Sequence, residues 1–563
     1  MNGYLKSVKS VASVILDYSR LYMLVNIIFT FLLNILSLSR IYILQQLMNK
    51  IQLGTHDFSY LVVFSVIYVL ADILERITDA CFMNYEASNR LKFKLYINKK
   101  ILEHAESLPL SAFENSKTFD IIERTKNFVP DDIFEFFQNH VRILSSVISS
   151  IFYVNILLTL DVFIFPLIFL IPLFQFYVNN KINKRQYNIL RNRTNKNRES
   201  WYYKFLLLSG SFYKELKIYN FFTKLKKKFL DLEESFQNQD ISIIKESSQK
   251  NGFLSVINSM ILGYIFIDSI ARGYSGKLLL GDIVSIVRAI TSLQLQVTSI
   301  LTQSSDSIKK RLFFDQFLEF FELDSYNWGG SDNISIDTID CIEVVDLSFK
   351  YINQSENILK NISFKLEKGN FYAIKGENGC GKTTLIKLLL GLYDNYEGEI
   401  LINGIDLKLI NREEYLFNTA VLFQDFLKFE GKLSDNIKLN SRSDTSVEYC
   451  IKKFGLNKLV QSDFDCQLGY WFEDGKQLSS GEWQKVALAR CFYRNSSFVI
   501  LDEPNSNLDI PSVAIVSDII KKQIPNVITL SILHNIDTFE SNIDYFLNIN
   551  NGLLEVVKNE RKI

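Results

Sequence analysis

The sequence predicts two folds in one chain: an all-α domain of six transmembrane helices, followed by an α/β domain with a phosphate-binding loop. Three observations predict this. Long apolar stretches are confined to the first 320 residues, a glycine-rich loop follows an apolar strand near residue 376, and the net charge changes sign between the halves. Residues 1–320 carry 37 basic and 27 acidic side chains, whereas residues 321–563 carry 25 and 35. A chain of 563 residues also exceeds the usual size of one hydrophobic core.

Composition and charge exclude several classes of protein. With 48% apolar residues the chain is not disordered. A formal net charge of zero argues against nucleic-acid binding, which requires a basic excess. The six cysteines and four histidines are scattered without metal-ligand spacing, which favours reduced thiols on the cytosolic side over disulfides or a zinc site. No small-residue cleavage site follows the first apolar stretch, so no cleavable signal peptide is predicted.

Six stretches of the N-terminal half are long and apolar enough to cross a membrane, for which about 20 residues are needed. We place them near residues 21–46, 58–80, 141–160, 162–180, 251–272 and 281–303. Spans three and four are joined tightly at Asp161, and span four contains Pro166 and Pro172, which membrane helices tolerate. The alternative, a buried soluble bundle, suits this composition less well. The transmembrane domain is therefore assigned to residues 1–320.

The loop after span four orients the predicted membrane domain. Residues 181–230 contain fourteen Lys or Arg and only two acids. Positive loops stay on the cytoplasmic side, so an even number of spans places both termini there. Residues 4–18 have the pattern of an amphipathic helix in the membrane interface, and an ordinary cytosolic leader helix is the alternative.

Span two carries charges on one helical face. Asp72, Glu75, Arg76 and Asp79 fall within a sector of roughly 100°. Charges at membrane depth usually face a cavity and often mark a substrate path. The alternative is that they lie in water at the cytoplasmic end or in mutual ion pairs.

The C-terminal half contains a phosphate-binding loop between an apolar strand at 371–374 and a helix-like run at 385–390. Glycines in such a loop let backbone N–H groups surround phosphates, Lys382 reaches the β- and γ-phosphates, and Thr383 offers a hydroxyl to Mg²⁺. The predicted nucleotide ligands in the loop are Gly376, Asn378, Gly379, Cys380, Gly381, Lys382, Thr383 and Thr384.

Two acids end a second buried strand, at 498–503. In a P-loop ATPase, Asp502 would hold Mg²⁺ and Glu503 would polarise the attacking water. On its own this pattern indicates only a strand that meets a loop. Its position 120 residues after the phosphate-binding loop favours the catalytic interpretation.

At this point the chain resembles a known family, the ABC transporters of the exporter type, in which membrane and nucleotide-binding domains are fused. Tyr351, 25 residues before Gly376, resembles the aromatic residue that stacks on adenine. Gln424 resembles the glutamine that links Mg²⁺ and water to the membrane domain, and His534 stands where the family has its switch histidine. The resemblance implies ATP and Mg²⁺ as cofactors, with Glu503, His534 and Gln424 as catalytic residues.

The segment from Leu478 resembles the family signature, which caps the ATP bound by the opposite subunit. The matching residues are Ser479, Ser480, Gly481 and Glu482. Asp509 resembles the end of a loop that faces the partner subunit. One signature and one phosphate-binding loop cannot complete a site within one chain, so the resemblance implies two copies. A homodimer is expected because Glu503, His534, Gln424 and Lys382 are all present; a heterodimer is the alternative.

The residues around the signature, Leu468-Gly-Tyr-Trp-Phe before it and Trp483-Gln-Lys after it, are similar to those of lantibiotic and bacteriocin exporters. Two weaker resemblances are Phe113-Glu-Asn…Phe119-Asp120 and Lys277…Gly281-Asp282, which look like recurring exporter segments. No room remains before residue 21 for a leader-cleaving peptidase domain. The signature departs from the usual Leu-Ser-Gly-Gly-Gln at Ser480 and Glu482, which predicts a competent but slow ATPase.

These observations together predict an ATP-driven exporter in the bacterial cytoplasmic membrane, with its ATPase domain in the cytoplasm. A linker at 321–340 joins the membrane domain to an ABC nucleotide-binding domain at 341–563. The expected cargo is a bacteriocin-type peptide, with a modification enzyme as a further expected partner; a lipid or multidrug exporter is the alternative. An acidic face at Asp72, Glu75 and Asp79 would favour a cationic cargo.

Overall fold

The computed structural model describes residues 2–54, 58–115, 118, 121–122, 125, 130–157, 165–325, 334–351, 354–439, 445–460, 466–533 and 539–560. The chain divides into two compact units. The helical unit comprises Met1–Glu103 and Glu123–Glu322, and the sheet unit comprises His104–Ile122 and Leu323–Ile563. The short segment 104–122 thus packs with the sheet unit although more than 200 residues separate the two in sequence.

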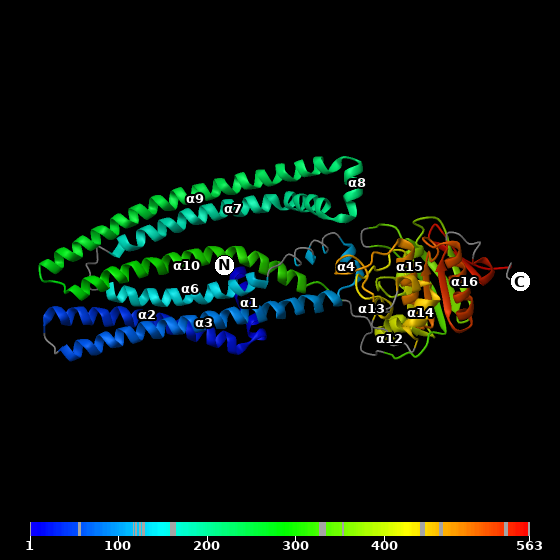
Figure 1. Cartoon of the computed structure of the whole chain (residues 1–563), viewed down its shortest axis with the longest axis horizontal. Coiled ribbons are helices and arrows are strands. Elements are labelled where there is room, and N and C mark those ends of the chain that lie inside the picture. The colour runs from blue at the N-terminus through cyan, green and yellow to red at the C-terminus, as the bar shows by residue number, and fades with distance from the viewer. Residues whose placement is uncertain are drawn as a thin grey trace. The chain divides into compact units, whose positions relative to one another are not determined.

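Long helices form the helical unit (Figure 1). Their bounds are α1 Asn2–Tyr18, α2 Arg20–Leu53, α3 Phe58–Ser107, α6 Pro130–Leu157, α7 Phe165–Leu208, α8 Tyr213–Ile218, α9 Phe221–Tyr274 and α10 Leu280–Phe321. The residues of α3 after Glu103 belong to the sheet unit. In Figure 1, α7 and α9 run side by side and the short α8 closes their far end.

Five helices within the described residues are long and apolar enough to cross a membrane: α2, α3, α6, α9 and α10. They contain the predicted spans one, two, three, five and six, apart from the last residues of span three. Residues 158–164, with the junction at Asp161 and the start of span four, lie outside the described residues. The rest of span four lies in α7, which carries Pro172 inside the helix.

Helix ends in this unit follow from their sequence. Ser19 caps α2 by accepting a hydrogen bond from the backbone N–H of Tyr22, and Gly54 ends the helix in the left-handed conformation that glycine adopts without steric cost. The amphipathic pattern at 4–18 forms α1, whose Val11 and Ile15 are fully buried against other helices.

The segment Gly281-Asp282 sets the approach of α10 to α2. A Cβ at Gly281 would lie 2.2 Å from the carbonyl oxygen of Gln45, so only glycine fits this contact. Asp282 accepts hydrogen bonds from the side chains of Gln45 (2.9 Å) and Asn49 (2.8 Å) and from the backbone N–H of Leu279. The exporter-like segment is therefore a helix–helix contact.

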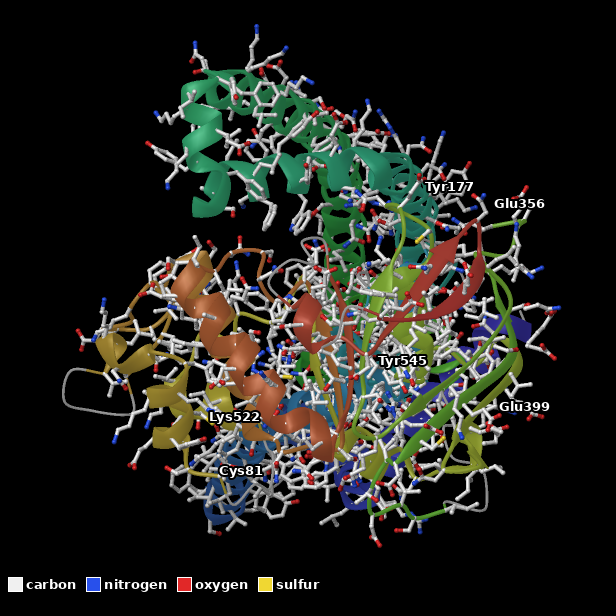
Figure 2. The ribbon with its side chains drawn as sticks, turned by 90° about the vertical axis from the view of Figure 1, so that its right-hand side faces the viewer. Cys81, Tyr177, Glu356, Glu399, Lys522 and Tyr545 are labelled. Atoms are coloured by element: carbon white, nitrogen blue, oxygen red, sulfur yellow. The ribbon has the colours of Figure 1, made fainter. Side chains whose placement is uncertain are left out.

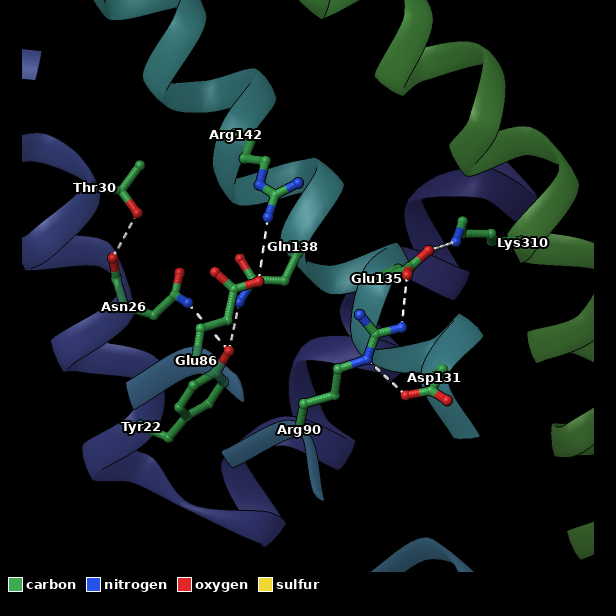
Figure 3. Close-up of polar contacts among 10 residues, drawn as sticks. All are labelled: Tyr22, Asn26, Thr30, Glu86, Arg90, Asp131, Glu135, Gln138, Arg142 and Lys310. Atoms are coloured by element: carbon green, nitrogen blue, oxygen red, sulfur yellow. Dashed lines mark hydrogen bonds and ion pairs between the residues drawn. The ribbon is translucent and has the colours of Figure 1, made fainter. Parts of the chain in front are cut away.

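Polar contacts join α3, α6 and α10 (Figure 3). Arg90 of α3 forms ion pairs with Asp131 (2.6 Å) and Glu135 (2.7 Å) of α6, and Lys310 of α10 pairs with Glu135 as well. On α2, the buried hydroxyl of Tyr22 accepts hydrogen bonds from Asn26 and from Gln138 of α6. These contacts hold the ends of four helices together.

The described residues of the sheet unit form two sheets. One has the order β2-β1-β4-β5 and the other the order β10-β9-β3-β8-β7-β6. Their bounds are β1 Cys341–Phe349, β2 Leu359–Glu367, β3 Phe371–Lys375, β4 Glu397–Ile402, β5 Ile405–Asp406, β6 Thr419–Leu422, β7 Phe498–Asp502, β8 Ile528–Ile532, β9 Tyr545–Asn550 and β10 Leu553–Lys558. In the second sheet β3 pairs in parallel with β8 and β9, and β7 pairs in parallel with β6 and β8.

The helices of the sheet unit after the phosphate-binding loop are α11 Lys382–Leu389, α12 Arg412–Phe417, α13 Leu433–Lys438, α14 Val447–Lys453, α15 Ser480–Tyr493 and α16 Ile510–Gln523. Figure 2 shows Lys522 on α16 and Tyr545 at the start of β9. Alternate residues of β7 pack into two separate apolar cores, Val499 and Leu501 into one, Phe498 and Ile500 into the other. Both faces of the strand are buried, so Asp502 and Glu503 emerge at a rigid edge.

Candidate nucleotide-binding site

The phosphate-binding loop connects β3 to α11, as the sequence predicts. Three of its glycines have positive φ angles: Gly376 (154°), Gly379 (84°) and Gly381 (106°). Two of them also lack room for a side chain. A Cβ would lie 2.4 Å from the carbonyl oxygen of Ile549 at Gly376, and 2.8 Å from Cγ2 of Ile358 at Gly381. The loop therefore needs glycine both for its conformation and for its packing.

Lys382, the first residue of α11, folds back over this loop. Its Nζ donates hydrogen bonds to the carbonyl oxygens of Gly376 (2.8 Å) and Glu377 (2.9 Å). A cation is thereby held beside the loop backbone and the N-terminus of a helix, a combination that attracts phosphate.

Glu503 follows β7 in an unusual backbone conformation, with a φ of 50°. Such a conformation strains a residue other than glycine by about 1–3 kcal/mol, and residues in such strain cluster at functional sites. The backbone N–H of Glu503 donates to the carbonyl oxygen of Ile532 on β8 (3.1 Å). Its carboxylate accepts a hydrogen bond from Nε2 of Gln424 at 3.1 Å.

One open pocket of about 620 Å³ brings the predicted residues together. The predicted residues in its wall are Tyr351, Asn378, Gly379, Gly381, Lys382, Thr383, Thr384, Gln424, Asp502 and Glu503. Ile358 and Ile532 complete the wall and were not predicted. Ile358 directly precedes β2 and Ile532 ends β8, and in sequence both are ordinary apolar residues that only their position beside the loop reveals.

Tyr351 stands at one end of this pocket and connects it to a second cluster. Its hydroxyl lies 2.9 Å from Oγ1 of Thr384, and its ring makes an edge contact with Tyr393 at 5.8 Å between centroids. The hydroxyl of Tyr393 donates to Glu114 of the short helix α4 (Leu110–Glu114). Burial, followed by the Glu114 carboxylate, raises the pKa of Tyr393 well above its usual value, so the phenol keeps the proton that it donates.

Glu114 also forms an ion pair with Lys387 on α11, at 2.9 Å. Through Glu114, the segment 104–122 thus contacts both α11, which follows the phosphate-binding loop, and Tyr393, which packs against Tyr351. The exporter-like pattern at Phe113-Glu-Asn covers this contact, but Phe119 and Asp120 lie outside the described residues.

The signature segment forms the start of α15. Ser479 and Glu482 make a reciprocal capping box: the hydroxyl of Ser479 accepts from the backbone N–H of Glu482 (3.3 Å), and the carboxylate of Glu482 accepts from the backbone N–H and the hydroxyl of Ser479 (both 2.8 Å). The substitution of glutamine by Glu482 therefore serves the helix start. Within the described residues, no signature side chain lines the pocket of Lys382.

The remaining predicted residues lie as follows. Gly376 and Cys380 belong to the phosphate-binding loop but do not line the pocket. Ser480 is exposed at the first position of α15. A hydrogen bond from Ser512 lowers the pKa of the exposed Asp509 carboxyl, so it is ionised at neutral pH. His534 lies outside the described residues.

Comparison with known proteins agrees with this geometry. The family model described as ABC transporter matches residues 359–506, from β2 to the turn after β7. The chain is 32% identical to the subtilin transport ATP-binding protein SpaT of Bacillus subtilis over 488 residues, which cover 85% of this chain and 80% of that protein. The chain belongs to the ABC transporters. It is an ATP-hydrolysing transporter whose membrane and ATPase domains are fused.

Two further likenesses extend over almost all of this ABC transporter. It is 29% identical to the nisin transport ATP-binding protein NisT of Lactococcus lactis subsp. lactis, covering 95% of this chain and 90% of that protein. A solved structure of a bacterial Atm1-family ABC exporter with ATP bound superposes with a TM-score of 0.77 at 18% identity, covering 95% and 96% of the two chains. At this identity the superposition shows that the fold is shared.

Proposed function

We propose that this transporter exports a lantibiotic-type peptide across the bacterial cytoplasmic membrane, driven by ATP hydrolysis. The observation that supports this cargo is the likeness to the subtilin and nisin transport proteins along most of the chain. The pattern Gly469-Tyr-Trp-Phe before the signature points the same way.

The pocket of Lys382 supports a specific division of labour. Tyr351 would stack on adenine, and the glycine loop with Lys382 would hold the phosphates. Glu503, held by Gln424 at 3.1 Å, would accept a hydrogen bond from the attacking water and orient it in line with the γ-phosphate. His534 would contact the γ-phosphate.

The donor chemistry of the pocket fits Mg²⁺. Thr383, Gln424 and Asp502 line it together, and they offer hydroxyl, amide and carboxylate oxygens, the hard ligands that Mg²⁺ prefers. Asp502 is buried, with only 4% of its surface exposed. Bound Mg²⁺ would neutralise part of the phosphate charge.

A second copy would complete each site. Ser479 and Gly481 of one copy would close over the nucleotide bound by Lys382 of the other, so two copies would be clamped by two ATP molecules and released on hydrolysis. Because one chain carries Lys382, Gln424, Glu503 and the signature, a homodimer with twelve spans is the simplest assembly. Both termini and the ATPase domain would lie in the cytoplasm.

The contacts of Glu114 support a route for coupling. Opening or closing of the phosphate-binding loop would displace α11, and Lys387 and Tyr393 would carry this displacement to α4 and the end of α3. Helix α8 (Tyr213–Ile218), in which Leu216 is buried and Ile218 is 78% exposed, is the second candidate for a coupling segment.

The predicted acidic face on α3 is paired with an arginine of α2. Arg40 of α2 forms ion pairs with both Asp72 (2.8 Å) and Glu75 (2.6 Å), and Arg76 also contacts Asp72, whereas Asp79 is exposed. Asp72 and Arg76 form the mutual pair of the alternative, whereas Glu75 is paired with Arg40 of α2. A cationic cargo would have to compete with Arg40 for these carboxylates.

Transport into inside-out vesicles that contain the purified protein tests both ideas. When ATP is added to the outside of these vesicles, they should accumulate a lantibiotic precursor peptide inside. Accumulation of a lipid or multidrug substrate in place of the peptide would favour the alternative exporter class. Asp72→Asn with Glu75→Gln should reduce accumulation of a cationic peptide. The triple variant that adds Arg40→Gln separates the causes: recovered export would mean that the two acids only neutralise Arg40, and a persistent defect would mean that they contact the cargo.

A further inference from the structure

Gln484 joins the signature helix to the turn that carries Glu503. It lies on the first turns of α15 and is 2% exposed. Its Nε2 donates to the carbonyl oxygens of Pro504 (2.8 Å) and Glu503 (3.3 Å), and its Oε1 accepts from the backbone N–H of Asn507 (3.0 Å). Both ends of one side-chain amide are thus used on a single turn.

Two neighbours of Gln484 contact the same turn. At Gly481, a Cβ would lie 2.7 Å from the carbonyl oxygen of Asn507, so the helix start and the turn approach backbone to backbone. At Lys485, the ammonium lies 3.8 Å from the carboxylate of Asp509. The start of α15 and residues 503–509 therefore form one packed structure.

This turn needs support because Glu503 has a φ of 50°. The carbonyl oxygen of Pro504 accepts from Gln484, and that of Glu503 accepts from Gln484 and from the backbone N–H of Ser506 (3.3 Å). A buried carbonyl left without a donor costs about 1–3 kcal/mol. The amide of Gln484 supplies donors to both. An apolar side chain of similar size would fill the space but leave both carbonyls and one N–H without this partner.

We propose that Gln484 is a positioning residue for catalysis. It holds the backbone of Glu503 so that the carboxylate faces the attacking water, and it makes this orientation depend on the helix that begins at Ser479. The signature that closes over one ATP and the acid that acts on the other ATP then move as one piece. The proposal rests on the role of Glu503 proposed above.

The decisive variant is Gln484→Glu, studied in the full-length protein in lipid nanodiscs. An ionised carboxylate can accept from Asn507 but cannot donate to Pro504, whereas a protonated carboxyl has one donor for Pro504 and an acceptor for Asn507, and so restores two of the three hydrogen bonds of the native amide. Burial raises the pKa of a carboxyl, so protonation should occur within the range of the assay. We expect kcat for ATP at pH 8.5 to fall at least tenfold with KM changed less than twofold, because the pocket of Lys382 is intact.

The ratio of variant to wild-type kcat, measured from pH 6 to 8.5, should rise at least fivefold as the pH falls. Gln484→Leu should show the loss of kcat without this rise. Gln523→Glu, at the end of α16, is the matched control and should follow the wild-type profile. Binding of a fluorescent ATP analogue checks that each variant is folded.

A Gln484→Glu variant with normal kcat, with a loss that does not depend on pH, or with lost nucleotide binding at every pH would overturn the proposal. Glu503→Gln, measured in parallel, separates this failure from failure of the proposed mechanism. If Glu503→Gln hydrolyses ATP normally, the catalytic role of Glu503 is wrong, whatever the Gln484 profile shows. If Glu503→Gln is inactive and Gln484→Glu is normal, only the positioning role is wrong.

Discussion

The capping box at the signature makes Glu482→Gln the most informative single substitution. The carboxylate of Glu482 accepts both the backbone N–H and the hydroxyl of Ser479 at 2.8 Å. The hydroxyl of Ser479, the group expected to meet the γ-phosphate of the partner-bound ATP, is therefore directed at a negative charge. Glutamine also forms capping boxes, so the substitution keeps the helix start and removes mainly the charge.

The size of the effect follows from this contact. A hydrogen bond to a charged acceptor contributes about 1.5–3 kcal/mol, roughly 1 kcal/mol more than one to a neutral acceptor. If the difference is used to release Ser479 toward ATP, the barrier falls by about 1 kcal/mol, which corresponds to about a fivefold rise in turnover. The weaker cap should lower the free energy of unfolding by about 0.5 kcal/mol.

The measurement is phosphate release by the full-length protein in nanodiscs at saturating ATP. Glu473→Gln is the control, because this exposed acid precedes the same helix without forming the box. The double variant with Ser480→Gly should be at least as fast as Glu482→Gln. Unchanged or slower turnover in both variants, with Glu473→Gln like wild type, would refute the idea that the signature limits the rate.

Three further predictions concern the pocket and its connections. Glu503→Gln should bind ATP normally but reduce turnover, measured as phosphate release, at least a hundredfold. Turnover close to wild type would contradict the assignment. In a variant whose other accessible cysteines are replaced by serine, N-ethylmaleimide at pH 8 should modify Cys380 and block ATPase activity, and bound ATP should protect against this loss. Cys450 and Cys491 should stay unmodified, because burial raises their pKa to about 11 and about 12 and leaves little thiolate at that pH. Full activity after labelling would show that this thiol lies away from the nucleotide. Glu114→Gln should lower the ratio of peptide transported to ATP hydrolysed about threefold, since a partly exposed ion pair contributes at most about 1 kcal/mol. An unchanged ratio would exclude Glu114 from coupling.

Local features of this chain were predictable from sequence because their physics is local. The phosphate-binding loop requires glycines between a buried strand and a helix, and β3, the loop and α11 lie where the pattern places them. The capping box of Ser479 and Glu482 spans one helical turn. Five of the apolar spans coincide with long helices, because about 20 apolar residues are enough to define each one.

Contacts between distant segments were decided only by the tertiary structure. Glu114 reaches Lys387, 273 residues later, and nothing in either segment signals the pairing. Arg40 of α2 pairs with Asp72 and Glu75 of α3, and neither helix's own sequence shows which residues of the other helix lie opposite it. The same holds for Gln484. In sequence it is only a polar residue of a helix, and the structure shows its amide bonded to the carbonyls of Glu503 and Pro504 and to the N–H of Asn507. The chemical groups that this transporter possesses follow from its amino-acid sequence, and the packing of distant segments decides which of these groups act on one another.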